Sequence, residues 1–189
     1  YHPTAEAARA AGFRACKRCR PDEARDELRH ASAPTALGPV TVAVSDKGLR
    51  AMVFGDGPNA LADLQRRFPR AYLKADAAGL AGTLAEVAEL IAHPGRPSGL
   101  KLDERGTQMQ AQVWKALRAI PAGRTASYAE VARAIGRPRA FRAVAQACGA
   151  NPLAVITPCH RVVGANGALT GYHWGMDRKR ALLEREALA

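Results

Sequence analysis

Apolar and polar residues alternate over residues 40–54, with a short polar stretch at residues 46–48. The alternating apolar positions are Val40, Val42, Val44, Met52 and Phe54. Side chains that repeat with a period of two belong to a strand with one buried face. A polar stretch that ends in glycine between two such runs is typical of a tight turn. The pattern therefore predicts a β-hairpin with residues 46–48 in its turn.

Apolar residues return at helical spacing in the next two segments. Leu61, Leu64 and Phe68 are three or four positions apart, and the segment LAGTLAEVAELIAH repeats the same period. Two such helices beside the hairpin predict a small α/β subdomain over residues 34–100. The preceding residues 1–33 are rich in alanine, arginine and charge, and we expect short helical pieces and a linker there.

The second half of the chain is predicted to be helical. In TQMQAQVWKALRAI, one helical face carries Met109, Val113, Ala116, Leu117 and Ile120. The segment TASYAEVARAIG then opens on Ser127 with Glu130 three residues later, which is a capping box, and Gly136 is a C-terminal stop. After the turn RPR, AFRAVAQACGAN predicts a second short helix. Two short helices joined by a glycine-containing turn form a helix-turn-helix pattern.

The second helix of this pair is narrow, because positions 140, 143, 145 and 147 are all alanine and Arg142 projects among them. Few of its side chains suit the reading of base edges in the major groove. The helix therefore favours contacts with the DNA backbone, its shape or its minor groove. The charge of the chain also favours contacts with DNA. The formal net charge is +11, and residues 101–189 carry 14 Lys and Arg against 6 Asp and Glu. Such a balance favours a polyanionic partner, and solubility alone is the alternative reason for it.

Composition narrows the class of protein further. The chain has 189 residues, 48% of them hydrophobic, but no apolar run of about 18 residues, so we expect no membrane span. No signal peptide is recognisable after Tyr1, and we expect a cytoplasmic protein that is a fragment or a processed product. In that compartment the four cysteines are not expected to form a disulfide framework.

The segment ITPCHRVVG places a thiol, an imidazole and a guanidinium at consecutive positions between two apolar runs. Two interpretations are open: a small cysteine buried at the end of a strand, or a thiolate activated for attack. A free thiol titrates near pKa ~8.5, so activation of Cys159 needs a base or a cation nearby. On an extended strand His160 points away from Cys159, so a bridging water or a turn after Pro158 is required. Glu186, on an apolar helix face, is a candidate carboxylate to orient the imidazole.

The stretch TPCHRVVGANGALTGYHWGMDRKRALLEREA closely resembles the C-terminal signature of the O6-alkylguanine-DNA alkyltransferases. The similarity continues upstream through GTQMQAQVWKALRAIPAGRTASYAEVARAIGRPRAFRAVAQACGANP and, more weakly, through LGPVTVAVSDKGLRAMVFGD, and covers residues 34–188. It implies an α/β fold. A small, ribonuclease H-like N-terminal subdomain would occupy residues 34–100. A helical, winged-helix-like alkyltransferase domain with the helix-turn-helix would occupy residues 101–189.

The resemblance also implies an activity, which is DNA repair by direct and irreversible alkyl transfer. A methyl or other alkyl group moves once from O6-alkylguanine in double-stranded DNA to a cysteine of the protein. The damaged base is rotated out of the duplex, which a monomer binds from its minor-groove side, and no cofactor takes part. O4-alkylthymine is a further candidate substrate, and the sequence leaves the range of accepted alkyl groups open.

The family's functional residues map onto this chain by position. Cys159 resembles the alkyl acceptor, and His160 resembles the base that acts on it through water. Glu186 resembles the carboxylate that orients this base, and Asn151 resembles the residue that ties the preceding turn to the active site. The positions that correspond to DNA and base binding are Tyr128, Ala140, Arg142, Ala143, Val162, Tyr172, His173, Gly175 and Lys179.

Five of these positions have a more specific role by the same resemblance. Arg142 would enter the base stack where the damaged base leaves, and Tyr128 would rotate the backbone phosphate. Tyr172, with His173 and Gly175, would line the alkyl pocket. Phe141 departs from the family pattern, since relatives have Ala or Val there, and we expect its bulk to change the packing of the second helix.

The segment YHPTAEAARAAGFRACKRCRPDEA resembles the second half of the zinc-binding module of Ada-type methyltransferases. That module binds zinc with four cysteines, and only Cys16 and Cys19 are present here. We interpret residues 1–33 as a truncated remnant with an incomplete zinc half-site, and we expect no bound metal.

Two other classes of function are weighed against repair. A DNA-binding regulator or lesion sensor is the first, but lesion sensors of this family lack the acceptor cysteine that Cys159 resembles. A cysteine-dependent hydrolase is the second, and it needs an oxyanion hole and a substrate cleft that no motif in the sequence marks.

Overall fold

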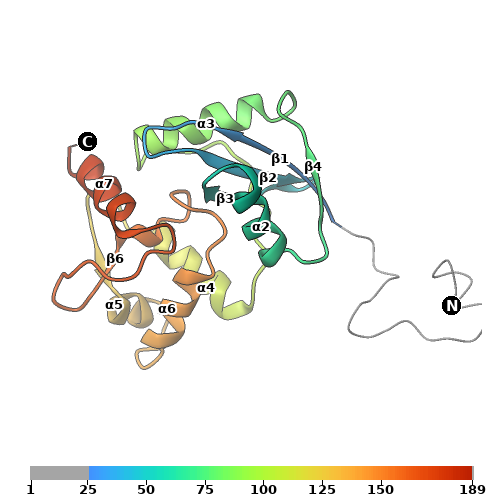
Figure 1. Cartoon of the computed structure of the whole chain (residues 1–189). Coiled ribbons are helices and arrows are strands. Elements are labelled where there is room, and N and C mark those ends of the chain that lie inside the picture. The colour runs from blue at the N-terminus through green and yellow to red at the C-terminus, as the bar shows by residue number, and fades with distance from the viewer. Residues whose placement is uncertain (1–25, 189) are drawn as a thin grey trace, which may run out of the picture.

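A four-stranded sheet forms the N-terminal part of the computed structural model, which describes residues 26–188 (Figure 1). Its strands are β1 (Glu27–Ala33), β2 (Val40–Ser45), β3 (Gly48–Phe54) and β4 (Tyr72–Ala75). The strand order is β3-β2-β1-β4, with β1 antiparallel to β2, β2 antiparallel to β3, and β1 parallel to β4. The predicted β-hairpin is confirmed, since β2 and β3 pair up to Ser45 opposite Gly48.

The interpretation of residues 27–33 as helix and linker is wrong, because they form β1 in the middle of the sheet. In ELRHASA the two most buried side chains, Leu28 and Ala31, are three positions apart, which reads as a helix period. In the strand they lie in different core clusters on the two faces of the sheet. The four-stranded sheet therefore includes residues 27–33, ahead of the predicted boundary at residue 34.

The two predicted helices of this half are confirmed, and they cover opposite faces of the sheet. On one face, α2 (Gly57–Arg67) packs Ala60 and Leu64 against the cluster of Leu28, Ala43, Ala51 and Val53. On the other face, α3 (Ala81–Ala92) contributes Leu84, Val87 and Ile91 to a larger core. Successive side chains of β2 point to opposite faces of the sheet, so the strand contributes to both cores. Val42 and Val44 lie on the α3 side and Ala43 lies on the α2 side.

The C-terminal half is helical, as expected. Its elements are α4 (Gln108–Arg118), β5 (Ala126–Ser127), α5 (Tyr128–Ala134), α6 (Phe141–Gly149), the 3₁₀ turn η1 (Cys159–Arg161), β6 (Val162–Val163) and α7 (Met176–Ala187). Helix α4 buries Val113, Trp114 and Leu117. The indole of Trp114 donates to the carbonyl of Ala147 in α6, 2.9 Å away, which ties the helix-turn-helix to α4. A single apolar core runs from these helices to the α3 face of the sheet.

The connection between the two halves is paired to the hairpin. The amide of Leu49 donates to the carbonyl of Lys101 (2.8 Å), and the amide of Asp103 donates to the carbonyl of Leu49 (2.9 Å). Buried Asp103 also accepts from the hydroxyl of Ser45 at 2.7 Å. Helix α7 is attached to the N-terminal half as well, through Arg178 and the carbonyl of Leu37 (2.9 Å). These contacts fix the sheet against the helix that carries Glu186. No helix within residues 26–188 is long and apolar enough to cross a membrane.

Candidate active site

Cys159 lies at the start of a single 3₁₀ turn and not on an extended strand. The turn is closed by a hydrogen bond from the amide of Arg161 to the carbonyl of Pro158 (3.0 Å). Cys159, His160 and Arg161 are all buried. Successive side chains of a 3₁₀ turn are about 120° apart, because three residues make one turn. The structure therefore has the turn after Pro158 that was one of the two predicted alternatives, in place of an extended strand.

Asn151 connects the end of the helix-turn-helix to this turn. Its Nδ2 donates to the carbonyl of Thr157 (2.8 Å) and lies 3.2 Å from Sγ of Cys159. Its Oδ1 accepts from the amide of Leu153 at 2.9 Å. A fully buried amide with three partners is held in one orientation. The position of the sulfur is therefore tied to residues 151–157.

His160 and Glu186 form a buried pair, with Nε2 of the imidazole 2.8 Å from Oε1 of the carboxylate. Burial by itself would raise the pKa of Glu186, but hydrogen bonds from His160 and Arg161 lower it to about 2. Glu186 is therefore ionised at neutral pH and can only accept, so Nε2 of His160 donates. The lone pair of the neutral ring is then on Nδ1, which has no hydrogen-bond partner among the described residues. Burial also lowers the pKa of His160, despite the opposing effect of Glu186.

Arg161 completes this arrangement and was not among the functional residues that the sequence predicted. Its Nη2 lies 2.8 Å from Oε1 of Glu186, and its Nε lies 3.1 Å from both carboxylate oxygens. Its Nη1 donates to the carbonyl of Ile120. The one signal in the sequence was its place directly after His160. The consecutive imidazole and guanidinium thus bind the same carboxylate from two sides.

The electrostatics of Cys159 favour the neutral thiol in this structure. Burial raises its pKa to about 11, against the hydrogen bond from Asn151 and the charge of Lys179, which lower it. Lys179 is fully buried, and its Nζ donates to the carbonyls of Val162 (2.5 Å) and Thr170 (2.6 Å). A base is therefore needed to form the thiolate at neutral pH. The other described cysteine, Cys148, has its pKa raised by burial to about 12.

Aromatic residues from the loop before α7 lie beside this site. The ring of Tyr172 meets His160 edge to face, with centroids 6.5 Å apart, and meets Trp174 at 5.3 Å. His173 packs on Trp174 at 5.2 Å, and its Nε2 lies 3.9 Å from a carboxylate oxygen of Asp63 in α2. Gly175 has a positive φ of 97° at the start of α7, where the chain turns sharply into the helix. The structure thus brings Tyr172 next to His160, whereas His173 is partly exposed and faces the N-terminal half.

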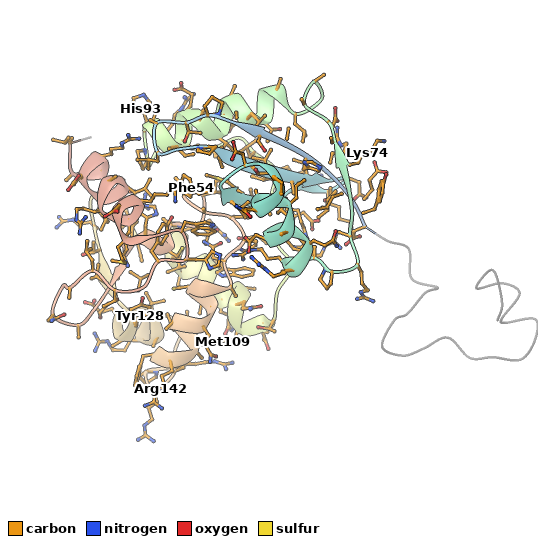
Figure 2. The ribbon with its side chains drawn as sticks, viewed as in Figure 1. Phe54, Lys74, His93, Met109, Tyr128 and Arg142 are labelled. Carbon is orange, nitrogen blue, oxygen red and sulfur yellow. The ribbon has the colours of Figure 1, made fainter. Side chains whose placement is uncertain are left out.

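The helix-turn-helix forms as predicted. The capping box of Ser127 and Glu130 is present at the start of α5, and Gly136 has a positive φ of 71° in the turn before α6. Arg142 is exposed and projects from the end of the domain, and Tyr128 lies nearby (Figure 2). The Tyr128 hydroxyl is 3.5 Å from Oγ1 of Thr170, in the loop that leads to Tyr172.

The first residue of α6 lies outside the apolar core. Phe141 is 46% exposed and belongs to neither core cluster, and an effect of its bulk on the packing of the helix stays a prediction. Val144 and Ala147 make the buried face of α6 instead. Ala140 and Ala143 are half-buried next to Phe141 and Arg142, which leaves these two as the long side chains at the start of the helix.

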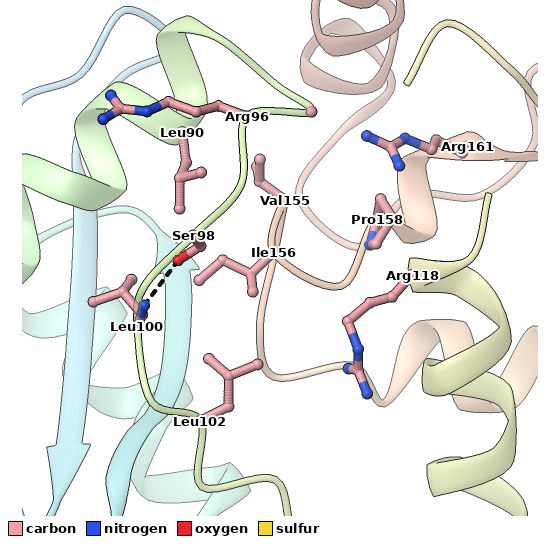
Figure 3. A pocket seen from close by; sticks show the side chains of 11 residues that line it. Leu90, Arg96, Ser98, Leu100, Leu102, Arg118, Val155, Ile156, Pro158 and Arg161 are labelled. Atoms are coloured by element: carbon pink, nitrogen blue, oxygen red, sulfur yellow. Dashed lines mark hydrogen bonds between the residues drawn. The ribbon is translucent and has the colours of Figure 1, made fainter. Parts of the chain in front are cut away.

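A pocket of about 270 Å³ is lined in part by the turn that carries Cys159 (Figure 3). Its wall is formed by Leu90, Gly95, Arg96, Ser98, Leu100, Leu102, Arg118, Val155, Ile156, Pro158 and Arg161. Within it, the hydroxyl of Ser98 accepts from the amide of Leu100 at 3.1 Å. Pro158 and Arg161 belong to both the pocket wall and the 3₁₀ turn, so the pocket lies directly against the turn.

The described residues contain no group of three or more His, Cys, Asp and Glu side chains that could hold a metal ion. Cys16 and Cys19 lie outside the described residues. In the sequence they supply two thiolates, and a structural zinc site takes four ligands. The residues present therefore do not fit a complete zinc site.

The fold and the site define a class of proteins that carry a buried cysteine and an oriented imidazole on a domain with a helix-turn-helix. Known proteins that are similar to this chain belong to such a class. The family model described as "6-O-methylguanine DNA methyltransferase, DNA binding domain" matches residues 108–188, and that described as "Metal binding domain of Ada" matches residues 1–22. The methylated-DNA–protein-cysteine methyltransferase of Methanosarcina acetivorans is 38% identical over 165 residues, which is 84% of this chain and 98% of the relative. The chain belongs to the methylated-DNA–protein-cysteine methyltransferase family.

Two further similarities refine this placement. The bifunctional transcriptional activator/DNA repair enzyme Ada of Escherichia coli is 47% identical over 161 residues, which is 85% of this chain but 46% of the relative. The chain thus spans about half the length of that relative. The solved structure of Mycobacterium tuberculosis OGT in complex with DNA superposes with a TM-score of 0.71 at 39% identity, over 86% of this chain and 93% of that one.

Proposed function

We propose that this protein repairs DNA by moving the alkyl group of O6-alkylguanine onto Sγ of Cys159, once per molecule. The observation that carries the proposal is the buried turn in which Asn151 holds the sulfur and Glu186 holds His160. This arrangement pairs an acceptor thiol with a neutral imidazole whose Nδ1 lone pair is available. The family to which the chain belongs supports the same reaction.

The reaction proceeds by nucleophilic displacement at carbon. Nδ1 of His160 takes the thiol proton through a water molecule, and the imidazolium is stabilised by Glu186. Sγ of Cys159 attacks the alkyl carbon, the C–S bond forms, and the bond from that carbon to O6 of guanine breaks with its electron pair. Guanine leaves as the anion and takes a proton from the Tyr128 hydroxyl or from water. The thioether is stable, so the protein does not turn over.

DNA binding is assigned to the helix-turn-helix. Ala140 and Ala143 let α6 approach the minor groove closely, and Arg142 fills the space of the rotated base. Tyr128 contacts the phosphate next to that base. A monomer suffices for these contacts and no cofactor is needed. Such a protein acts in the cytoplasm, at the nucleoid.

The base pocket is assigned to the residues around the catalytic turn. The backbone of Cys159 and Val162 contacts the guanine amino group, and Lys179 keeps the Val162 carbonyl in place. Tyr172, His173 and Gly175 line the alkyl side. The segment with Cys16 and Cys19 has no part in this reaction, because it offers two of four zinc ligands.

Intact-protein mass after incubation with a duplex carrying one O6-methylguanine tests the proposal. Wild-type protein gains one methyl group on the Cys159 peptide. Cys159→Ala gains none, and Cys148→Ala, a matched control, gains it as wild type does. Binding of the duplex without a mass gain would identify a lesion sensor or regulator and reject the transfer reaction.

A further inference from the structure

Phe141 is an exposed aromatic residue with no role in the core. It is the first residue of α6 and is 46% exposed, one of three large exposed apolar side chains within residues 26–188, with Tyr72 and Leu188. Helix α6 packs through Val144 and Ala147, and Phe141 belongs to neither core cluster. The fold therefore gives no packing reason for an aromatic ring at this position.

The surroundings of Phe141 are strongly basic. Arg137, Arg139 and Arg142 are exposed, and none of them forms an ion pair with a described residue. A shallow apolar hollow is lined by Arg137, Pro138, Arg139 and Ala140, the four residues that precede Phe141 in the chain. An apolar ring inside a cationic patch fits a partner that combines negative charge with flat apolar faces, which is the chemistry of duplex DNA.

Phe141 also contacts the residue implied to enter the base stack. The guanidinium carbon of Arg142 lies 5.9 Å from the centroid of the Phe141 ring. This is within the range of a cation–π interaction, which restricts the guanidinium more than solvent would. Figure 2 shows Arg142 extending away from the body of the domain, so this side chain leads the approach of this end to a surface.

We propose that Phe141 is a second DNA-contacting side chain, an apolar wedge that enters the minor groove beside Arg142. Apolar side chains at such places slip between base steps, unstack them and bend the duplex. In this chain the wedge opens the stack next to the damaged base, and its ring holds the Arg142 guanidinium ready to fill the gap. This inference rests on the proposed function and adds a stacking contact to it.

Equilibrium binding of the full chain to a short duplex with one O6-methylguanine, at several salt concentrations, tests the wedge. Phe141→Ala weakens binding about tenfold, the loss of one stacked ring, and leaves the dependence of log K on log salt unchanged because the contact is apolar. Arg139→Ala, in contrast, lowers that slope by about one. Phe141→Trp retains the affinity. Tyr72→Ala, which removes an exposed ring far from α6, binds as wild type.

Two results would overturn the proposal. The first is that Phe141→Ala binds the duplex as tightly as Tyr72→Ala does. The second is that Phe141→Ala lowers the melting temperature of the protein together with its affinity, which would make the ring structural. Methyl transfer to the wild-type protein is measured first. If it binds the duplex but takes no methyl group, the proposed function fails and the wedge is judged on binding alone.

Discussion

The Nε2 atom of His160 lies 2.8 Å from Oε1 of Glu186, and neither side chain is accessible to solvent. The same oxygen also accepts from Arg161 at 2.8 Å. One carboxylate thus sets the tautomer of the imidazole and neutralises a buried guanidinium. Catalysis and stability are expected to depend on it together.

Glu186→Gln is expected to impair both properties. An amide cannot balance the charge of Arg161, and breaking a buried ion pair costs roughly 3–5 kcal/mol. The amide of the variant also no longer fixes Nε2 of His160 as the donor, so methyl transfer is expected to slow by about 100-fold. Single-turnover methyl transfer and urea unfolding measure the two effects. Glu184→Gln, on the exposed face of the same helix, is the control, and equal behaviour of both variants would contradict the assignment.

Acid stability follows from the same carboxylate. Its pKa is lowered from 4.5 to about 2 by His160 and Arg161, against the effect of burial. A carboxyl whose folded pKa is depressed stabilises the protein above its unfolded pKa, and this stabilisation is lost as the pH falls from 4.5 towards 2. Thermal unfolding as a function of pH should show wild type losing more stability over this range than Glu186→Gln. A parallel decline of the two curves would be the contrary result.

Alkaline conditions act through Cys159. Burial raises its pKa from 9.0 to about 11, so the folded state favours the protonated thiol. A group with a raised folded pKa stabilises the protein below its unfolded pKa, and this contribution is lost as the pH rises from 9.0 to about 11. Cys159→Ala should therefore lose less stability than wild type across that interval in thermal melts. If the thiol were already ionised at neutral pH, the difference would be absent.

Lys179→Gln is expected to make the thiol harder to ionise. The buried ammonium donates to the carbonyls of Val162 and Thr170, and its charge lowers the pKa of Cys159. Its removal raises the pH at which iodoacetamide reacts with Cys159 at half its maximal rate. Lys115→Gln, an exposed position on α4, leaves that midpoint unchanged. A midpoint in Lys179→Gln equal to wild type would exclude an electrostatic role for the lysine.

Gly48 and Gly82 differ in whether the fold requires a glycine at that position. Gly48 has a φ of 141°, and a Cβ there would lie 2.3 Å from the carbonyl oxygen of Lys101 in the connection between the halves. Gly48→Ala is expected to destabilise the protein by roughly 2 kcal/mol or more. Gly82, in α3, has open space around it, so Gly82→Ala is expected to stabilise by about 0.5 kcal/mol. Chemical denaturation compares the pair, and effects of the same sign would reject this reading of Gly48.

The periodic segments were predictable from the sequence. The hairpin of β2 and β3 alternates with period two, and α2, α3 and α4 repeat at helical spacing, so local patterns determine them. Strands β1 and β4 were not predicted. Strand β1 lacks a clear alternation and β4 has only four residues, and they form because they pair with each other and because β1 also pairs with β2. A local pattern of apolar and polar residues does not predict pairing between segments that are distant in the sequence.

For the site, the sequence by itself determined which groups are present: the motif around Cys159, its family and the residues that correspond to the family's functional positions. The tertiary structure decided how they act. Residues 159–161 form a 3₁₀ turn and not an extended strand, and Arg161 forms an ion pair with Glu186. Phe141 is left exposed next to Arg142. These outcomes depend on burial and on contacts between residues as far apart as 161 and 186. Side-chain identity sets the available chemistry, whereas packing sets the distance, the protonation state and the exposure at which that chemistry operates.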